Sequence, residues 1–188
     1  MGIGSPLVQT RRAVFLDRDG VLNRAVVRDG RPYPPSSLRE VELLDGVLDA
    51  VARLRAMGFL LVAVTNQPDV ARGTATLKGV DEINAFVAGK LGLDLVKTCA
   101  HDDHDDCPCR KPRPGLLIAA SQELGIDLGA SYMVGDRWRD IAAGEAAGCK
   151  TVFVDYRYSE KQPQSPDYRC GSLLEWVNHF EEVGRRAL

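Results

Sequence analysis

Short apolar runs alternate with segments of helical periodicity along this chain, and that alternation limits its fold more than any other feature. A parallel strand that is buried on both faces reads as a continuous apolar run, and each crossover to the next parallel strand needs a helix-length segment. The expected strands are residues 13–16, 59–64, 94–98, 132–134 and 151–154, and the expected helices are residues 46–57, 78–91, 114–124 and 172–184, with a further helix ending at Ala147. The pattern predicts an α/β fold: a single Rossmann-like, doubly wound parallel sheet of about five strands with helices on both faces.

The length of 188 residues fits one domain of ordinary size. We expect residues 1–12 to form an N-terminal extension and residues 13–188 to form the domain. Glycine and proline are frequent between residues 21 and 45, so this stretch is predicted to be an irregular loop. Neither residues 20–45 nor residues 99–110 are long enough to hold a cap domain.

Charge and hydropathy argue against several kinds of partner. The net charge is −2, which gives no support to a nucleic-acid or membrane-surface partner. No run of 18 apolar residues is present, so no transmembrane helix is expected, and the first residues lack the apolar stretch of a secretory signal. We therefore expect a cytoplasmic protein.

Polar residues stand where three of the expected strands end. Asp17 and Asp19 follow the first strand, Thr65 ends the second, and Asp136 ends the fourth. In an open α/β sheet, ligands bind at the carboxyl ends of the strands, so these side chains are expected to meet in one crevice. Taken singly, each aspartate also fits a turn or a helix cap. Together they favour a hard-oxygen site for Mg²⁺, an ion that also takes phosphate as a ligand.

These residue types suit phosphate transfer. A carboxylate such as Asp17 can attack phosphorus and form an aspartyl-phosphate, which divides one difficult step into two. A second carboxylate two residues later, Asp19, can act as general acid and then as general base. Lys111, in a loop just before a helix, can supply a positive charge to the phosphate, and Mg²⁺ offsets the repulsion between two anions.

The same residues resemble the signatures of the haloacid dehalogenase-like (HAD-like) phosphatases. Residues 15–21 are similar to the first signature, Thr65 to the second, Lys111 to the third, and Gly135-Asp136 with Asp140 to the fourth. The resemblance implies that Asp17 is the nucleophile and Asp19 the acid and base, and that Thr65 and Lys111 hold phosphate, with Asn66 a further candidate. It also implies that Mg²⁺ is bound by Asp17, by the backbone carbonyl of Asp19 and by Asp136, with Asp140 supporting these ligands.

A cluster of cysteines and histidine precedes Lys111. Three thiolates and one imidazole form a closed structural zinc set, from Cys99, His101, Cys107 and Cys109. His104 is an alternative to His101, and a loop of reduced, unligated cysteines is an alternative to the whole site. Because Arg110 and Lys111 follow Cys109 directly, a bound zinc would fix the start of the segment that carries Lys111.

Other residues near the cluster have simpler interpretations. The acidic residues Asp102, Asp103, Asp105 and Asp106 are interpreted as a solvated stretch, because carboxylates are poorer ligands for a soft site. Cys149 precedes an apolar run and is expected to be a small buried hydrophobic residue.

Within the HAD-like family, the chain resembles two groups, whose substrates are D-glycero-D-manno-heptose 1,7-bisphosphate and histidinol phosphate. Residues 65–67 and 107–112 are similar to both, whereas residues 70–73 and 131–136 favour the heptose group. We expect removal of the 7-phosphate of the heptose bisphosphate first, and hydrolysis of histidinol phosphate second. Pro68-Asp69 departs from the heptose pattern and adds a negative charge to the loop.

The substrate is thus expected to be a small phosphorylated sugar or a similar metabolite, and the protein a monomer. Arg72 and Arg110 are candidates to hold the sugar or a second phosphate, since guanidinium binds phosphate in a fork geometry; otherwise they are ordinary surface arginines. Two further functions stay open: a polynucleotide 3′-phosphatase, which would need a basic groove, and a non-catalytic zinc-binding scaffold.

Overall fold

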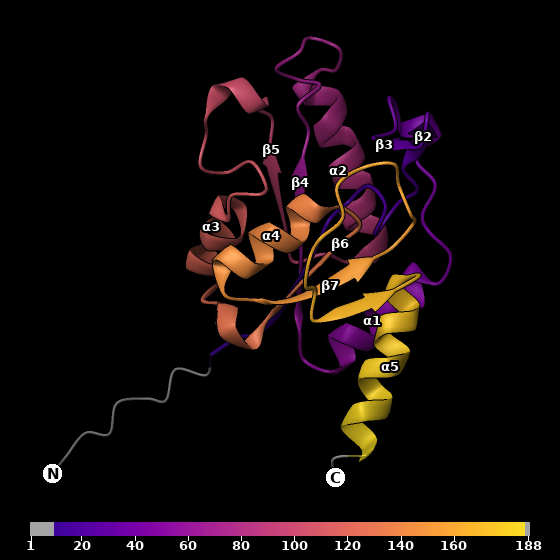
Figure 1. Cartoon of the computed structure of the whole chain (residues 1–188), viewed down its shortest axis with the longest axis vertical. Coiled ribbons are helices and arrows are strands. Elements are labelled where there is room, and N and C mark those ends of the chain that lie inside the picture. The colour runs from indigo at the N-terminus through magenta and orange to yellow at the C-terminus, as the bar shows by residue number, and fades with distance from the viewer. Residues whose placement is uncertain (1–9, 187–188) are drawn as a thin grey trace, which may run out of the picture.

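Six parallel strands form the central sheet, in the order β5-β4-β1-β6-β7-β8 (Figure 1). The computed structural model describes residues 10–186, so most of the predicted N-terminal extension lies outside the described residues. The strands are β1 (Ala13–Leu16), β4 (Leu60–Asn66), β5 (Leu95–Cys99), β6 (Tyr132–Gly135), β7 (Lys150–Val154) and β8 (Tyr168–Cys170). The α-helices are α1 (Val47–Ala56), α2 (Leu77–Leu91), α3 (Gly115–Leu124), α4 (Trp138–Ala147) and α5 (Leu173–Arg186).

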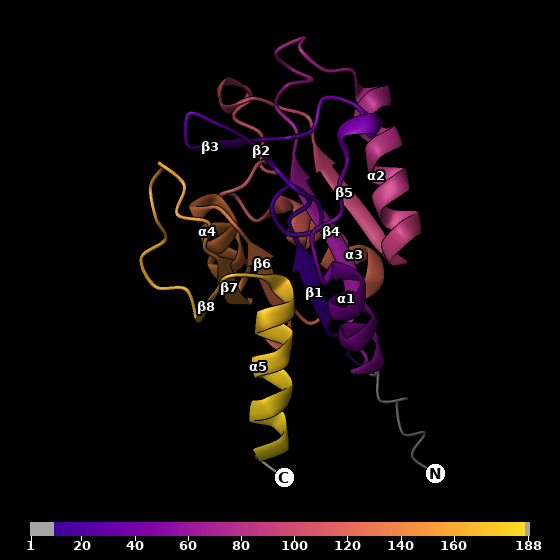
Figure 2. The same cartoon turned by 90° about the vertical axis from the view of Figure 1, so that its right-hand side faces the viewer.

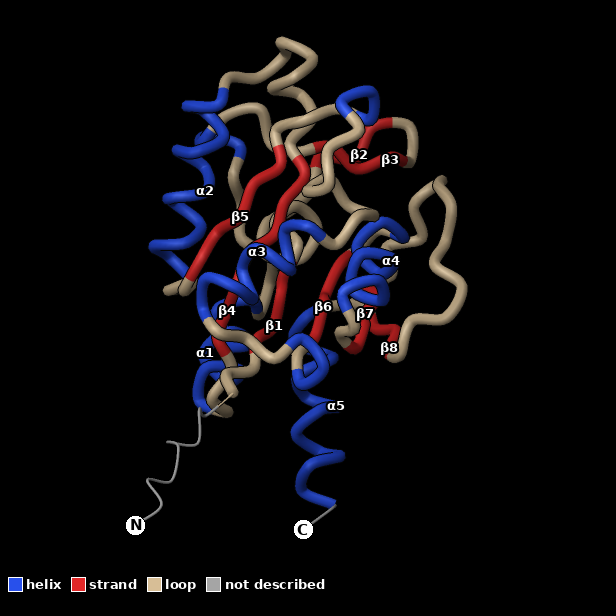
Figure 3. The backbone as a smooth tube through the Cα atoms, turned by 90° about the vertical axis from the view of Figure 1, so that its left-hand side faces the viewer, coloured by secondary structure: helices blue, strands red, loops and turns tan. Residues whose placement is uncertain are grey.

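The helices cover both faces of the sheet, as the sequence predicted. Val14 and Leu16 of β1 pack in one core with α1, α2 and α5, whereas Phe15 packs in a second core with α3 and α4. Successive side chains of a strand point to opposite faces, so a strand covered on both sides must be apolar throughout. Figure 2 shows α1 and α5 in front of the sheet, and Figure 3 shows α3 and α4 in front of it. Cys149 is buried in the second core, as expected.

The order of the strands reverses at β1. The chain adds β4 and β5 on one side of β1 and then crosses to add β6, β7 and β8 on the other side. Ligands of such sheets bind at the carboxyl ends of the strands near the reversal. Here these are the ends of β1, β4 and β6, which carry the predicted catalytic residues.

The stretch of residues 21–45 differs from its prediction as an irregular loop. It contains an antiparallel hairpin of β2 (Val26–Arg28) and β3 (Arg31–Tyr33) and a short 3-10 helix, η1 (Leu38–Glu40). The hairpin turns at Asp29 and Gly30, whose φ values are 50° and 71°. Positive φ at both central residues of a two-residue turn is what an Asp-Gly pair provides.

The sixth strand, β8, is also absent from the prediction. Its three residues, Tyr168, Arg169 and Cys170, pair with β7 at the edge of the sheet. A short edge strand with a charged residue lacks the continuous apolar run of the central strands. Among the described residues, no helix is long and apolar enough to cross a membrane.

Candidate active site

A buried lysine lies between two buried aspartates at the carboxyl end of the sheet. Lys111 Nζ donates to Asp17 Oδ1 at 2.8 Å and to the carbonyl of Val64 at 2.7 Å, and it lies 2.6 Å from Asp140 Oδ1. Lys111 is 1% exposed and Asp17 is 8% exposed. Asp17 follows β1 directly, and its backbone N–H donates to Val134 of β6, which fixes its position between the two strands. The paired carboxylates raise the pKa of Lys111, so this lysine is a fixed positive charge at the site.

Asn66 fixes the backbone of this lysine. Its side-chain oxygen accepts from the N–H of Lys111 at 3.1 Å, and its side-chain nitrogen donates to the carbonyl of Lys111 at 3.0 Å. Both ends of the carboxamide are therefore engaged at the end of β4. The sequence suggested Asn66 as a phosphate or substrate ligand, and the structure places it as a support for Lys111.

The carboxylate of Asp19 is held by three neighbouring side chains. Arg18 makes a two-pronged contact, with Nε at 3.1 Å and Nη2 at 2.8 Å, and Asn23 and Gln67 each donate at 2.9 and 2.8 Å. Gln67 also donates to Thr65 Oγ1 at 2.9 Å, which links the ends of β1 and β4. Sequence reasoning missed the roles of Arg18, Asn23 and Gln67, because nothing in their spacing indicates a shared partner.

Two glycines allow the aspartates to approach one another. A Cβ atom at Gly20 would lie 1.9 Å from Asp136 Oδ2, and a Cβ atom at Gly135 would lie 2.1 Å from Asp140 Cβ. Real Cβ contacts are never so short, so only glycine fits at these two positions. The turn after β1 and the end of β6 can thereby meet around one point.

Three carboxylates converge there with oxygen atoms within 4.8 Å of one another, from Asp17, Asp136 and Asp140. Both oxygens of Asp136 are buried, and no side chain or backbone group among residues 10–186 makes a well-aligned hydrogen bond to them. The Tyr158 hydroxyl lies close by and lowers the pKa of Asp136. Burial and the charges of Asp17 and Asp140 raise the pKa of Asp136, and burial raises that of Asp17 to about 7. Buried carboxylates that lack enough positive charge fit a hard divalent cation with oxygen ligands. Asp140, predicted to support the ligands, belongs to this cluster and also accepts from the Arg137 backbone N–H at 3.0 Å.

The sulfur and nitrogen atoms of the predicted zinc set lie close together. Cys109 Sγ lies 3.2 Å from Cys99 Sγ and 3.3 Å from both Cys107 Sγ and His101 Nδ1. Ligands around a tetrahedral zinc lie about 3.5–3.8 Å apart, given Zn–S and Zn–N bonds of about 2.3 and 2.0 Å. The cluster therefore has the donor set and the spacing of a closed zinc site, and it includes His101 rather than His104.

Purified protein is expected to contain about one zinc per chain, and Cys107→Ser to lower that content to less than about half. Without metal, burial and the two neighbouring thiols raise the pKa of Cys109 to about 12, so zinc binding must displace protons. Zinc should therefore be lost progressively as the pH falls below about 6. Elemental analysis of protein purified without chelator checks both statements, with Cys149→Ser as the control that keeps its zinc. A metal-free preparation would contradict them.

A small cavity of about 60 Å³ opens beside the carboxylates. Part of its lining consists of predicted site residues: Asp17, Asp19, Thr65, Asn66, Lys111 and Asp140. The rest forms a rim that the sequence did not indicate, with Pro32, Tyr33 and Pro34 from the hairpin and the residue after it, and Arg137 and Arg139 from the segment that begins α4. The strand ends thus form the floor, and the hairpin and the arginines border the opening.

Known proteins share this arrangement of sequence and fold. Residues 108–176 match the family model described as HAD-hydrolase-like. The D-glycero-beta-D-manno-heptose-1,7-bisphosphate 7-phosphatase of Escherichia coli K12 is 39% identical over 88% of this chain and 87% of its own length. The Helicobacter pylori J99 protein of the same name is 31% identical over 92% of this chain and 98% of its own. The chain belongs to the HAD-like phosphatases.

Solved structures agree with this family. The D,D-heptose 1,7-bisphosphate phosphatase of B. bronchiseptica, complexed with magnesium and phosphate, has a TM-score of 0.77 and 29% identity, and the alignment covers 92% of this chain and 99% of that one. A putative HAD-like phosphatase of Mesorhizobium loti has a TM-score of 0.74 and 32% identity, covering 93% and 87%.

The two arginines predicted to hold substrate differ in position in this HAD-like phosphatase. Arg72 makes a two-pronged contact with Asp102 at 2.7 Å and does not line the cavity, which removes the geometric support for its predicted role. Arg110 is 8% exposed and does not line this cavity either, but it lines a neighbouring one with Lys111 and Arg139. It donates to Asp103 at 2.8 Å and to the carbonyl of His101 at 3.2 Å.

The sequence suggested that the acidic stretch of residues 102–106 is solvated, but two of its carboxylates are paired with arginines. Asp102 pairs with Arg72, and Asp103 pairs with Arg110 and with Arg139 at 2.9 Å. Hydrogen bonds from Arg110 and Arg139 lower the pKa of Asp103 to about 2. The error arose because the arginines come from elsewhere in the chain, and charge composition alone does not reveal such pairs.

Proposed function

We propose that this phosphatase hydrolyses a phosphate monoester through an aspartyl-phosphate on Asp17, and that it removes the 7-phosphate of D-glycero-D-manno-heptose 1,7-bisphosphate. The contact of Asp17 with buried Lys111 at the floor of the cavity carries this proposal. The lysine holds the carboxylate in place and supplies positive charge where phosphate oxygens would bind. A non-catalytic scaffold would have no use for a buried lysine paired with two aspartates.

In the first step, an Asp17 carboxylate oxygen attacks phosphorus as the bond to the sugar oxygen breaks. Asp19 gives a proton to the departing oxygen, and its carboxyl is held in the same cavity by Arg18, Asn23 and Gln67. In the second step, Asp19 takes a proton from water as that water attacks phosphorus, and the bond to Asp17 breaks. Inorganic phosphate leaves, and both aspartates return to their starting states.

The metal and the phosphate have separate sets of residues. Asp17, Asp136 and the backbone carbonyl of Asp19 would hold Mg²⁺, with Asp140 beside them, and the ion would reduce repulsion between the phosphate and the carboxylates. Thr65 accepts from Gln67 and keeps its hydroxyl proton for a phosphate oxygen. Lys111, from the loop before α3, would meet the phosphate beside Asp17.

The relatives' substrates and the rim of the cavity support a sugar bisphosphate. Arg137 and Arg139 line the opening, and Arg110 adjoins it, so a second anionic group has partners. Asp69, whose negative charge departs from the heptose pattern, lies 3.5 Å from Arg72 and does not line the cavity. Its charge is therefore not placed to attract the amine of histidinol phosphate.

Kinetics on two substrates test this assignment. We expect a higher kcat/KM for heptose 1,7-bisphosphate than for histidinol phosphate, and a loss of about 10–100-fold on the bisphosphate in Arg110→Ala. Arg72→Ala is the matched control and is expected to stay within about threefold of wild type, because Arg72 is itself exposed and does not line the cavity. A preference for histidinol phosphate would overturn the substrate, and equal losses in both variants would remove Arg110 from the site.

Mg²⁺ is expected to raise the thermal stability of the zinc-loaded protein by about 3 °C or more near pH 8, and by much less near pH 5.5. The folded-state pKa values of Asp17 and Asp136 are raised, so the folded state without Mg²⁺ binds more protons than the unfolded state between about pH 4 and 7. The stability of the Mg²⁺-free protein therefore falls as pH rises through that window. Mg²⁺ binds the ionised carboxylates and restores that stability. Scanning calorimetry measures the shift, and Asp136→Asn should abolish it. An equal shift at both pH values would contradict the carboxylate site.

A further inference from the structure

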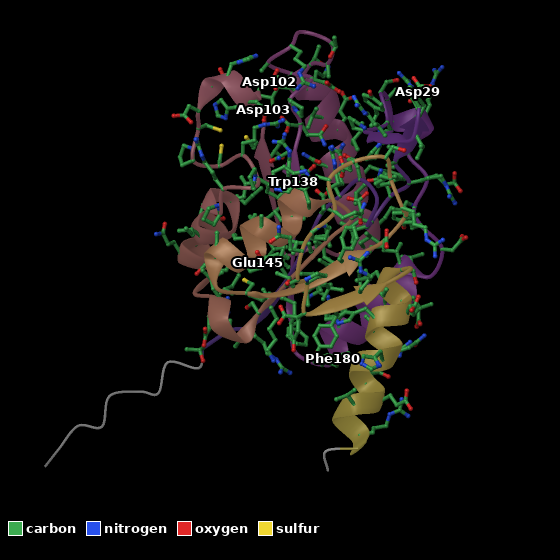
Figure 4. The ribbon with its side chains drawn as sticks, viewed as in Figure 1. Asp29, Asp102, Asp103, Trp138, Glu145 and Phe180 are labelled. Atoms are coloured by element: carbon green, nitrogen blue, oxygen red, sulfur yellow. The ribbon has the colours of Figure 1, made fainter. Side chains whose placement is uncertain are left out.

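The cations at the mouth of the cavity are already paired with carboxylates of this chain. Asp103 Oδ1 accepts from Arg110 Nε at 2.8 Å and from Arg139 Nη1 at 2.9 Å, so two guanidinium groups meet at one oxygen. Asp103 begins the short 3-10 helix η2 (Asp103–Asp105), in the loop between β5 and α3, where Figure 4 shows it next to Asp102. Arg139 belongs to the first turn of α4, so Asp103 bridges two separate segments.

A second cavity, of about 200 Å³, lies where these groups meet. It shares Lys111 and Arg139 with the catalytic cavity, and Asp103 and Arg110 are among its other lining residues. A substrate whose first phosphate lies at Asp17 would reach this space with its far end. Four cations line it: Arg110, Lys111, Arg113 and Arg139.

We propose that Asp103 occupies the place of the substrate's second phosphate when no substrate is bound, and that the second phosphate must displace it to reach Arg110 and Arg139. The inference rests on the proposed function and adds a specificity residue to it. Asp103 would thus select against substrates whose far end is neutral or weakly charged, because such a group cannot replace a carboxylate between two guanidinium groups.

The burial of the partners indicates which of them can move. The Asp103 side chain is 51% exposed, whereas those of Arg110 and Arg139 are 10% and 26% exposed. The arginines have further contacts that keep them in place: Arg110 donates to the carbonyl of His101, and the Arg139 guanidinium lies 5.2 Å from the ring centre of Trp138. Rotation of one exposed side chain therefore removes the carboxylate that both guanidinium groups share, and Asp102 stays 3.8 Å from Arg110 Nη2. A phosphate, with more charge and three oxygens, is a stronger partner for them than a carboxylate.

The opposite role is that Asp103 holds the arginines in the position that binds substrate. The two roles predict effects of opposite sign. If Asp103 competes with the second phosphate, Asp103→Asn should tighten binding of a bisphosphate. If Asp103 positions the arginines, the same change should weaken it.

The test compares heptose 1,7-bisphosphate with heptose 7-phosphate, which differ only in the second phosphate. We expect Asp103→Asn to lower KM for the bisphosphate about fivefold, with kcat and the KM for the 7-phosphate unchanged. Asp105→Asn is the matched control: it removes one charge from the same loop, lines neither cavity, and keeps an acceptor for the Asp102 N–H. It should leave both KM values at wild type. Zinc content confirms that each variant keeps its loop.

Arg139→Gln is expected to raise KM for the bisphosphate more than KM for the 7-phosphate, and Asp103→Asn added to it should lower KM for the bisphosphate less than it does in wild type. A raised KM for the bisphosphate in Asp103→Asn, or the same change in KM for both substrates, would overturn the role of Asp103 and leave the proposed function standing. Wild-type enzyme that hydrolyses p-nitrophenyl phosphate but neither sugar ester would overturn the substrate assignment, and this inference with it.

Discussion

Asp17→Asn is expected to lower kcat by about 10⁴-fold or more on every phosphate ester. An asparagine has the shape of the aspartate, and its side-chain oxygen can still accept from Lys111, but it carries no charge with which to attack phosphorus. Because Asp17 is one of three buried carboxylates, the substitution also removes repulsion at the site. The metal-free variant should therefore be at least as stable as wild type.

Steady-state rates with p-nitrophenyl phosphate and a sugar phosphate measure the loss, and calorimetry with zinc analysis shows that the fold is kept. Cys149→Ser, a change in the second core at the residue before β7, controls for handling of the protein. An Asp17→Asn enzyme within about tenfold of the wild-type rate would contradict the assignment of the nucleophile.

Asp19→Asn is expected to lower kcat/KM by about 10²–10⁴-fold, with a larger loss on alkyl than on aryl phosphates. An alkyl oxygen needs a proton as it departs, whereas a nitrophenolate leaves without one. Asn23 and Gln67 donate to Asp19, and an asparagine oxygen can still accept from one of them, so the turn after β1 should persist. Rates across a series of leaving groups measure this dependence. Equal losses on alkyl and aryl esters would show that Asp19 only supports the turn.

The central sheet could be predicted because its physical signal is local. A strand buried on both faces must be apolar, and Asp17, Thr65 and Asp136 interrupt or follow such runs at the edge where ligands bind. The hairpin also has a local signal, Asp29-Gly30 between extended residues, but the prolines that follow are typical of an irregular loop. The three residues of β8 carry no such signal.

The rim of the site could not be predicted from the sequence. Arg137 and Arg139 lie in the segment that begins α4, where the sequence shows only charged residues on a helix. Whether such an arginine meets solvent, a carboxylate or substrate depends on how the loop after β5 folds back over α4. Asp103 shows the same limit, because its two partners lie 7 and 36 residues away in the chain.

The proposed reaction requires a covalent bond between Asp17 and phosphate, and rapid acid quench of Asp19→Asn tests that bond most directly. Without its general base, this variant should hydrolyse the intermediate slowly, so a p-nitrophenyl phosphate reaction should show a burst of about one nitrophenolate per chain. Peptide mass spectrometry should then find the phosphoryl group on Asp17, labile to hydroxylamine as an acyl phosphate is. A linear release of nitrophenolate with no modified peptide, or a phosphoryl group on another residue, would contradict the account.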